Sequence, residues 1–234
     1  MNTPMNTPIS MPPFAATTRM ARPALSHIAI EGPIGAGKTA LATRLADRWG
    51  MRALLQSSAS NPFLERYYRD TSRHGLAAQL HFALQRERLS QEVTALRAAG
   101  TPLVTNFLAE RNDLFARLTL TSEELPLYEA LAARLVAHAP PPDLVVYLQA
   151  SPEALYARIQ KRANPAELPI TDAFLRALCD SYNEFFYHYD HAPVLTVGAE
   201  HLNPLDSDAD LALIADRIGT MRGRKESFVK GTSL

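Results

Sequence analysis

Residues 27–46 read HIAIEGPIGAGKTALATRLA, and this stretch decides the fold. Within it, Gly32 to Thr39 fit the pattern G-x-x-x-x-G-K-[ST] at every fixed position. The apolar run before the pattern is typical of a buried strand, and the residues after it favour a helix. Strand, glycine-rich loop and helix in this order are the context that a phosphate-binding loop requires. The stretch therefore predicts an α/β domain that binds a nucleoside triphosphate.

The residue types in this loop each have a chemical reason to bind phosphate. Glycines let the backbone turn tightly and point several N–H groups at one anion, and the dipole of the following helix favours negative charge there. Lys38 supplies a positive charge for the β- and γ-phosphates, and the Thr39 hydroxyl is a candidate ligand for Mg²⁺. The residues predicted to hold the nucleotide are Gly32, Pro33, Ile34, Gly35, Ala36, Gly37, Lys38 and Thr39.

The composition limits the class of protein. The chain has 234 residues, enough for one α/β domain of ordinary size. Its 24 basic and 24 acidic residues give a formal net charge of zero, which predicts a small-molecule acceptor rather than nucleic acid or a membrane surface. No apolar run approaches the about 18 residues of a membrane span. Cys179 is the only cysteine, which excludes an intrachain disulfide and predicts a reducing, cytoplasmic location.

Strand-like and helix-like stretches alternate along residues 25–221, which we expect to form one domain. This alternation predicts a doubly wound parallel sheet of about five strands with helices on both faces. Ligands of such sheets bind beyond the carboxyl ends of the strands. The expected strands are 27–31, 52–55, 102–107, 143–149 and 194–197, and the expected helices are 38–49, 72–99, 121–138, 152–163, 171–189 and 207–221.

Both ends of the chain differ from this pattern. Residues 1–24 begin with the near-duplicate MNTPMNTP, are rich in proline and lack the features of a secretory signal. We expect them to form a disordered extension. Residues 222–234 are modestly basic, and we expect a flexible tail there.

Two groups outside the loop are candidates for the site. Gln79, Phe82 and Arg86 share one face of the long predicted helix, and this face could read a nucleobase or could simply be solvated. Arg158 and Arg162, near the end of another helix, precede a proline-containing loop. They could form a lid that supplies charge during phosphoryl transfer, or they could only complement the helix dipole.

Taken together, the motifs resemble the deoxynucleoside kinase family, in particular its bacterial deoxyadenosine/deoxyguanosine kinase branch. The resemblance runs from about His27 to about Val197, and its most specific parts are SNPFLERYYRD at 60–70, AAQLHFALQRE at 77–87 and ARIQKR at 157–162. It implies a P-loop NTPase-type fold with a short helical lid. It also implies ATP as donor and the 5′-hydroxyl of a deoxynucleoside, with a purine favoured, as acceptor in nucleotide salvage. It implies a homodimer through the long helices, with a heterodimer containing an active paralogue as the alternative.

The resemblance assigns roles to particular residues. Gln79 matches the glutamine that hydrogen-bonds the nucleobase, and Arg86 matches the arginine at the inner end of that pocket. Tyr68 and Glu167 match the pair that holds the sugar 3′-hydroxyl. The lid arginines that reach the phosphates are matched by Arg158 and Arg162, whereas Asn164 stands where the family often carries a further arginine.

Two acids of the family are replaced in this chain. The family places a carboxylate just after the second strand, where it takes the proton of the 5′-hydroxyl. This position falls on Gln56, or on Ser57 with a one-residue shift. The third strand should also carry an aspartate that steers Mg²⁺, and Asn106 stands there as a weak candidate ligand. Acids that could serve as a displaced base are Glu65, Glu110 and Asp113.

Three interpretations follow from these replacements. The first is a working deoxynucleoside kinase that uses Lys38, Thr39 with Mg²⁺, and the lid arginines. The second is a catalytically impaired paralogue that binds nucleotide or nucleoside without transferring phosphate. The third, a nucleoside monophosphate kinase, is disfavoured because Tyr68 and Glu167 suit a free sugar and no extra arginine cluster is present for an acceptor phosphate.

Overall fold

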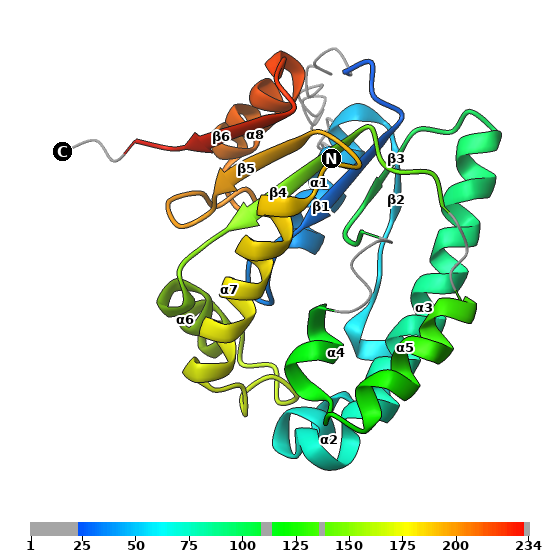
Figure 1. Cartoon of the computed structure of the whole chain (residues 1–234). Helices are drawn as coiled ribbons and strands as arrows, with labels where there is room; N and C mark the ends of the chain where they lie inside the picture. Colours follow the sequence, from blue (N-terminus) through cyan, green and yellow to red (C-terminus); the bar gives the residue numbers. More distant parts are fainter. Residues whose placement is uncertain (1–22, 109–113, 136–138, 232–234) are drawn as a thin grey trace, which may run out of the picture.

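In this computed structural model, which describes residues 23–108, 114–135 and 139–231, six parallel strands form one sheet. Their order across the sheet is β2-β3-β1-β4-β5-β6, and helices cover both faces (Figure 1). The predicted doubly wound sheet is therefore confirmed. The strands are β1 (His27–Glu31), β2 (Arg52–Leu54), β3 (Leu103–Thr105), β4 (Leu144–Gln149), β5 (Val194–Gly198) and β6 (Lys225–Val229).

The helices connect successive strands. In chain order they are α1 (Lys38–Trp49), the 3₁₀ turn η1 (Ser58–Ser60), α2 (Leu64–Arg69), α3 (Thr71–Ala98), α4 (Leu114–Thr119), α5 (Glu124–Leu135), α6 (Pro152–Arg162), α7 (Asp172–His188) and α8 (Asp208–Thr220). The end of the predicted helix 121–138 lies outside the described residues. No helix in the described part of the chain is long and apolar enough to cross a membrane.

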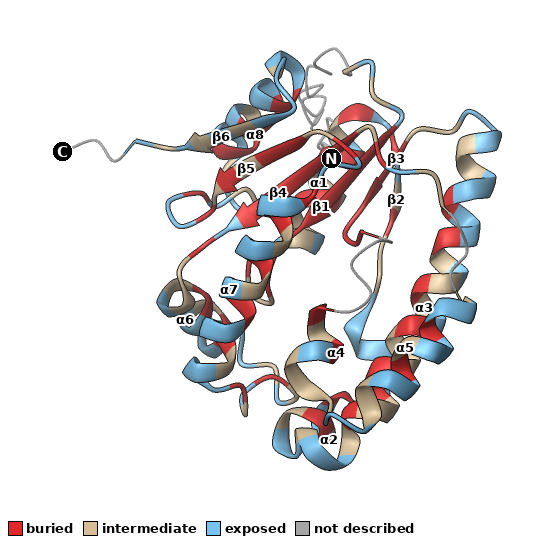
Figure 2. Cartoon of the chain, viewed as in Figure 1, coloured by how far each residue is buried: buried red, intermediate tan, exposed pale blue. Residues whose placement is uncertain are grey.

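Strand β1 shows how the sheet is buried on both faces (Figure 2). Ile28 and Ile30 belong to the apolar cluster that includes α1 and α8, whereas Ala29 between them belongs to the cluster built around α7. Because side chains alternate along a strand, this division places α1 and α8 on one face and α7 on the other. The near-continuous apolar sequence of β1 follows from burial on both sides.

The position of β1 explains where a ligand binds. It pairs with β3 on one side and with β4 on the other, so the chain connections diverge at its carboxyl end. In open parallel sheets this point of divergence is the crevice in which ligands bind. The glycine-rich loop begins directly after β1 and therefore lies at this crevice.

The expectation for the carboxyl end of the chain was wrong in part, and the sheet has six strands rather than about five. Lys225–Val229, within the expected flexible tail, pairs in parallel with β5 over its full length. Lys225 Nζ also donates to the carbonyls of Phe186 and Tyr187, at 3.1 and 2.6 Å. These bonds depend on partners far away in sequence, so local composition did not reveal the strand. The predicted disorder of residues 1–24 falls, for 1–22, outside the described residues.

Candidate functional site

A cavity of about 630 Å³ connects the glycine-rich loop with the long helix α3. Most of the residues that the sequence predicted for the site line this cavity. They are Ile34, Gly35, Gly37, Lys38, Thr39, Gln56, Tyr68, Gln79, Phe82, Arg86, Asn106, Arg162 and Glu167. Sequence reasoning missed the lining residues Ala40, Thr43, Arg44, Ser58, Leu64, Tyr67, Phe115 and Leu205.

The glycine-rich loop is held tightly against the sheet. Gly32 has φ 149°, and a Cβ atom there would lie 2.5 Å from the Leu148 carbonyl oxygen, so only glycine fits. Lys38, the first residue of α1, folds back and donates from Nζ to the carbonyls of Gly32 and Pro33 at 2.8 and 3.0 Å. The lysine therefore lies over the loop, where a bound polyphosphate would compete for its ammonium group.

Glu31, which the sequence analysis did not single out, braces the start of the loop. Its carboxylate is completely buried and accepts hydrogen bonds from Gly32 N at 2.9 Å and Leu108 N at 3.0 Å. The Tyr182 hydroxyl on α7 donates a third bond at 3.1 Å. Because a buried carboxylate is costly unless several donors surround it, Glu31 joins β1, the segment after β3 and α7 into one support.

The far end of the cavity contains the predicted base-reading pair on α3. Gln79 and Arg86 are both buried, at 1% and 6% exposure. Gln79 Nε2 donates to the Tyr67 hydroxyl at 3.2 Å, and Arg86 Nη2 donates to the Tyr128 hydroxyl at 3.4 Å. Burial raises the pKa of Tyr67, so its phenol stays protonated. This end of the cavity therefore offers amide and guanidinium groups already fixed in position.

The predicted sugar-binding pair, Tyr68 and Glu167, lies in the same cavity. The pKa of Tyr68 is raised well above its usual value, chiefly by burial, with smaller contributions from Tyr67 and Glu167. Glu167 is 3% exposed and forms an ion pair with Arg162. Asn164 Oδ1 accepts from Ala166 N at 3.2 Å and so stabilises the turn that carries Glu167. The turn after α6 thus brings a carboxylate and a lid arginine together.

Four predicted site residues do not line the cavity: Gly32, Pro33 and Ala36 of the loop, and Arg158. The Arg158 guanidinium donates to the carbonyl oxygens of Ala199 and Glu200, in the loop after β5. Burial lowers the pKa of Arg158, and the nearby Glu200 opposes this shift. In this structure Arg158 ties the lid helix α6 to the β5–α8 loop, and its assigned contact with phosphate stays a prediction.

Gln56 and Asn106, where the family resemblance predicts acids, lie side by side at the loop end of the cavity. Asn106 Oδ1 accepts from Gln56 N at 2.6 Å, and Asn106 Nδ2 donates to Gln56 O at 3.1 Å. Nδ2 also donates to Thr39 Oγ1 at 2.9 Å. A buried amide thus joins the loop helix, the third strand and the segment after the second strand.

Mg²⁺ requires oxygen ligands, and proteins usually bind it with one or two carboxylates. Asn106 turns an N–H group, not an oxygen, toward Thr39. Among the described residues that line the cavity, Glu167 is the only carboxylate, and it is paired with Arg162. The described residues therefore do not form a magnesium site as they stand.

Within the described part of the chain, none of the candidate displaced bases places a carboxylate in the cavity. Glu65 is exposed on α2 and pairs with Arg69 at 2.9 Å, one helical turn away. It does not line the cavity. Glu110 and Asp113 lie outside the described residues, so their role stays a prediction.

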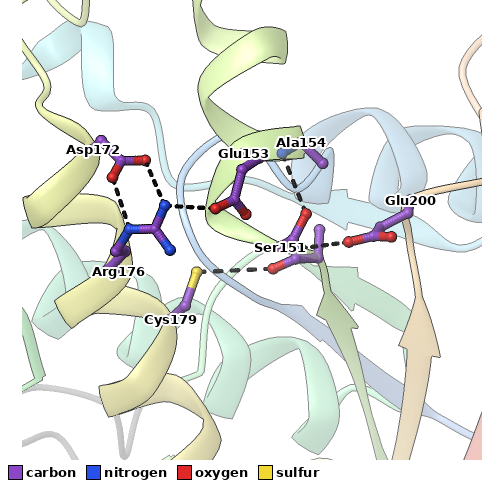
Figure 3. A network of polar contacts seen from close by, with 8 residues as sticks. Ser151, Glu153, Ala154, Asp172, Arg176, Cys179 and Glu200 are labelled. Carbon is purple, nitrogen blue, oxygen red and sulfur yellow. Dashed lines mark hydrogen bonds and ion pairs between the residues drawn. The ribbon is translucent and has the colours of Figure 1, made fainter.

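A second cavity, of about 550 Å³, lies between α7 and the loops after β4 and β5. Two of its charged lining residues, Arg176 and Glu200, already have polar partners (Figure 3). Arg176 pairs with Asp172 and Glu153, and Glu200 accepts from the backbone N–H of Ser151 at 2.8 Å. No residue of the glycine-rich loop lines it, so the first cavity is the candidate site.

Comparisons with known proteins agree with this geometry. The family model described as deoxynucleoside kinase matches residues 28–221. The deoxyguanosine kinase of Bacillus subtilis (strain 168) is 32% identical over 172 residues, which cover 73% of this chain and 83% of the relative. The deoxyadenosine/deoxycytidine kinase of the same organism is 26% identical over 206 residues, which cover 85% and 94%. A solved structure of deoxyadenosine kinase from M. mycoides with bound dATP has the same fold, with a TM-score of 0.72 at 23% identity, and covers 83% of this chain and 100% of that chain.

Proposed function

Because the chain belongs to the deoxynucleoside kinase family, we propose that it transfers phosphate from ATP to the 5′-hydroxyl of a deoxynucleoside, with a purine favoured, in nucleotide salvage. One observation carries the proposal. A single cavity is lined at one end by Lys38 and Thr39 of the phosphate loop and at the other by the buried pair Gln79 and Arg86. A donor and an acceptor nucleoside can therefore meet in one enclosed space.

Each group in the cavity has a proposed task. Gln79 and Arg86 orient the base, and Tyr68 with Glu167 holds the sugar 3′-hydroxyl. Lys38 exchanges its contacts with loop carbonyls for contacts with phosphate oxygens. Because phosphoryl transfer depends mainly on positioning and electrostatic stabilisation, these residues supply most of what the reaction requires.

A second candidate, a catalytically impaired paralogue that binds nucleoside or nucleotide, is favoured by a separate observation. Both expected acid positions hold neutral amides, and the Asn106 amide is bonded to Thr39 and to the backbone of Gln56. A nucleoside monophosphate kinase is disfavoured, because Tyr68 and Glu167, which line the cavity, suit the free hydroxyl of a sugar.

The test is phosphate transfer from ATP to each of the four natural deoxynucleosides, with Lys38→Ala as the blank and with MgCl₂ present or absent. Turnover above the blank on one or two deoxynucleosides would support the kinase. Equal rates for protein and blank, with ATP or nucleoside still bound in calorimetry, would favour the impaired paralogue.

The homodimer, or a heterodimer with an active paralogue, is proposed on the same family grounds. Exposed leucines on α3 and α5 support it: Leu84 is 46% exposed, Leu127 52% and Leu131 37%. Because α3 packs against α5, these apolar side chains are exposed on neighbouring helices, as an interaction surface requires. Light scattering of the protein and of Leu127→Lys tests this, because the substitution should shift the mass toward the monomer.

A further inference from the structure

The orientation of the Asn106 side chain is fixed by main-chain groups. A backbone N–H can only donate and a carbonyl can only accept, so Oδ1 must face Gln56 N and Nδ2 must face Gln56 O. Asn106 is 5% exposed, so water offers its amide few alternative hydrogen bonds. The amide therefore cannot turn over without breaking both bonds to Gln56.

This fixed orientation determines what Thr39 can offer a ligand. Nδ2 donates its second hydrogen to Thr39 Oγ1 at 2.9 Å and occupies a lone pair of that oxygen. A carboxylate at position 106 would act in the opposite way, because it would accept the Thr39 hydroxyl proton and leave the hydroxyl oxygen free for a cation. Asn106 thus leaves one lone pair of Thr39 Oγ1 for a cation and offers no acceptor for the hydroxyl proton, so Thr39 is a weaker ligand for a divalent metal than it would be beside an acid.

The charges around the loop act in the same direction. Lys38, Arg44 and Arg162 line the cavity, whereas the one carboxylate among its described lining residues, Glu167, is paired with Arg162. Glu31 beside the loop is buried, and its carboxylate already accepts three hydrogen bonds. Arg44 forms an ion pair with Asp208, which lies outside the lining, and Arg162 forms one with Glu167. Lys38 is therefore the described lining cation through which the loop end attracts a polyphosphate, and no other carboxylate of the described lining needs a metal ion to screen it.

We propose that Asn106 is a positioning residue that locks Thr39 and Gln56 together, so that the loop binds the polyphosphate of a nucleoside triphosphate with little dependence on a divalent cation. The inference rests on the proposed donor site but concerns binding, not transfer. It predicts that this chain differs from a phosphate loop that has an acid beside its threonine, where metal and nucleotide bind together.

The experiment is a calorimetric titration of the full-length protein with ATP, once in excess EDTA and once in excess MgCl₂. For the unmodified chain we expect the two dissociation constants to agree within about threefold. For Asn106→Asp we expect them to differ by about tenfold or more, with weaker binding in EDTA, because the new carboxylate repels phosphate and restores a metal ligand.

Asn106→Ala is the matched control, because it removes the bonds to Thr39 and Gln56 without adding charge. Its melting temperature should fall, and because Thr39 Oγ1 is released, its two dissociation constants should differ by more than in the unmodified chain but by less than in Asn106→Asp. A requirement for Mg²⁺ in the unmodified chain, or unchanged constants in a folded Asn106→Asp, would overturn the inference, and so would no binding of ATP in either buffer. Metal-independent binding without turnover would uphold it while contradicting the kinase proposal.

Discussion

The two ends of the cavity keep their polar groups in different ways. At the end where we propose that the base binds, called here the base-binding end, Gln79 and Arg86 are buried and line the cavity. Their hydrogen bonds go to the side chains of Tyr67 and Tyr128. At the loop end, the side-chain amide of Asn106 forms hydrogen bonds with Thr39 and with the backbone of Gln56. One end thus holds the groups that we propose recognise the base, and the other holds neutral amides where the family resemblance leads us to expect acids.

This difference has an energetic meaning. Burying an amide or a guanidinium costs stability unless it is hydrogen-bonded, so the base-binding end retains groups that an apolar core would not need. At the loop end, the amide of Asn106 satisfies buried backbone groups and holds segments of the fold together. The comparison suggests that recognition of a nucleoside and transfer of phosphate can be separated by mutation in this chain.

The largest effect that we expect is on turnover, from a substitution that places an acid at the loop end. If position 56 is the site of the missing general base, Gln56→Glu should raise turnover by about 10²–10⁴. Gln91→Glu, the same substitution at an exposed position of α3 outside the cavity lining, is the control and should leave the rate unchanged. Steady-state phosphate transfer with both variants makes the measurement. An unchanged rate in Gln56→Glu would mean that the missing acid does not limit the reaction.

The next largest effect that we expect is on ATP affinity, from a substitution that disturbs only the loop end. Gly32→Ala introduces a Cβ atom 2.5 Å from the Leu148 carbonyl, at a backbone angle that disfavours any side chain. We expect ATP affinity to fall by about 100-fold or more, because the loop must move away from its strand. Binding of a deoxynucleoside, measured by calorimetry, should change little. Equal loss of both ligands would show that the two ends are not independent.

A smaller effect is expected on deoxynucleoside affinity, from a substitution at the base-binding end. Gln79→Leu removes the buried amide, and we expect deoxynucleoside affinity to fall by about 10- to 100-fold, the cost of a lost hydrogen bond and an unpaired partner. ATP affinity should be retained. Gln91→Leu, the same substitution at an exposed position of α3, is the control. Retained nucleoside affinity in Gln79→Leu would contradict the proposed reading of the base.

The smallest effect that we expect is on the free energy of unfolding, which should decrease at acid pH. The two ends of the cavity should therefore be compared near neutral pH. Burial, reinforced by Arg97 and opposed by Asp143, lowers the pKa of His27 from 6.5 to about 4. The unfolded chain therefore binds the proton more readily, so stability is lost as the pH falls from 6.5 toward 4. We expect a loss of about 2 kcal/mol between pH 8 and pH 5. Urea unfolding at both pH values should show this loss, and His27→Gln should reduce it, whereas His201→Gln at the surface should not.

The sequence predicted the elements around the loop most accurately. The expected strand 27–31 and helix 38–49 have the bounds that the structure shows for β1 and α1. Two short helices, α2 and α4, were missed, because each has 6 residues and is too short to display a helical period. Strand β6 was missed because backbone pairing with β5, rather than apolar alternation, makes it a strand.

Part of the candidate site could also be predicted from the sequence, because some of its residues follow a helical period. Gln79, Phe82 and Arg86 share one helix face, so the helical period alone placed them together at the cavity. The same period counted from Thr39 would have indicated Thr43, one turn along α1, which the sequence analysis overlooked. No such signal pointed to Glu31, whose partners come from three separate parts of the chain.

By itself, the sequence determined the phosphate loop, because its glycines, lysine and threonine act through local backbone geometry and the start of one helix. It also determined that acids are absent at positions 56 and 106. Only the tertiary structure decided that Asn106 holds Thr39 and Gln56, which are 67 and 50 residues away in sequence, and that Arg158 turns to the β5–α8 loop. The physical reason is that hydrogen bonds between distant segments form only after the sheet has brought the ends of its strands together.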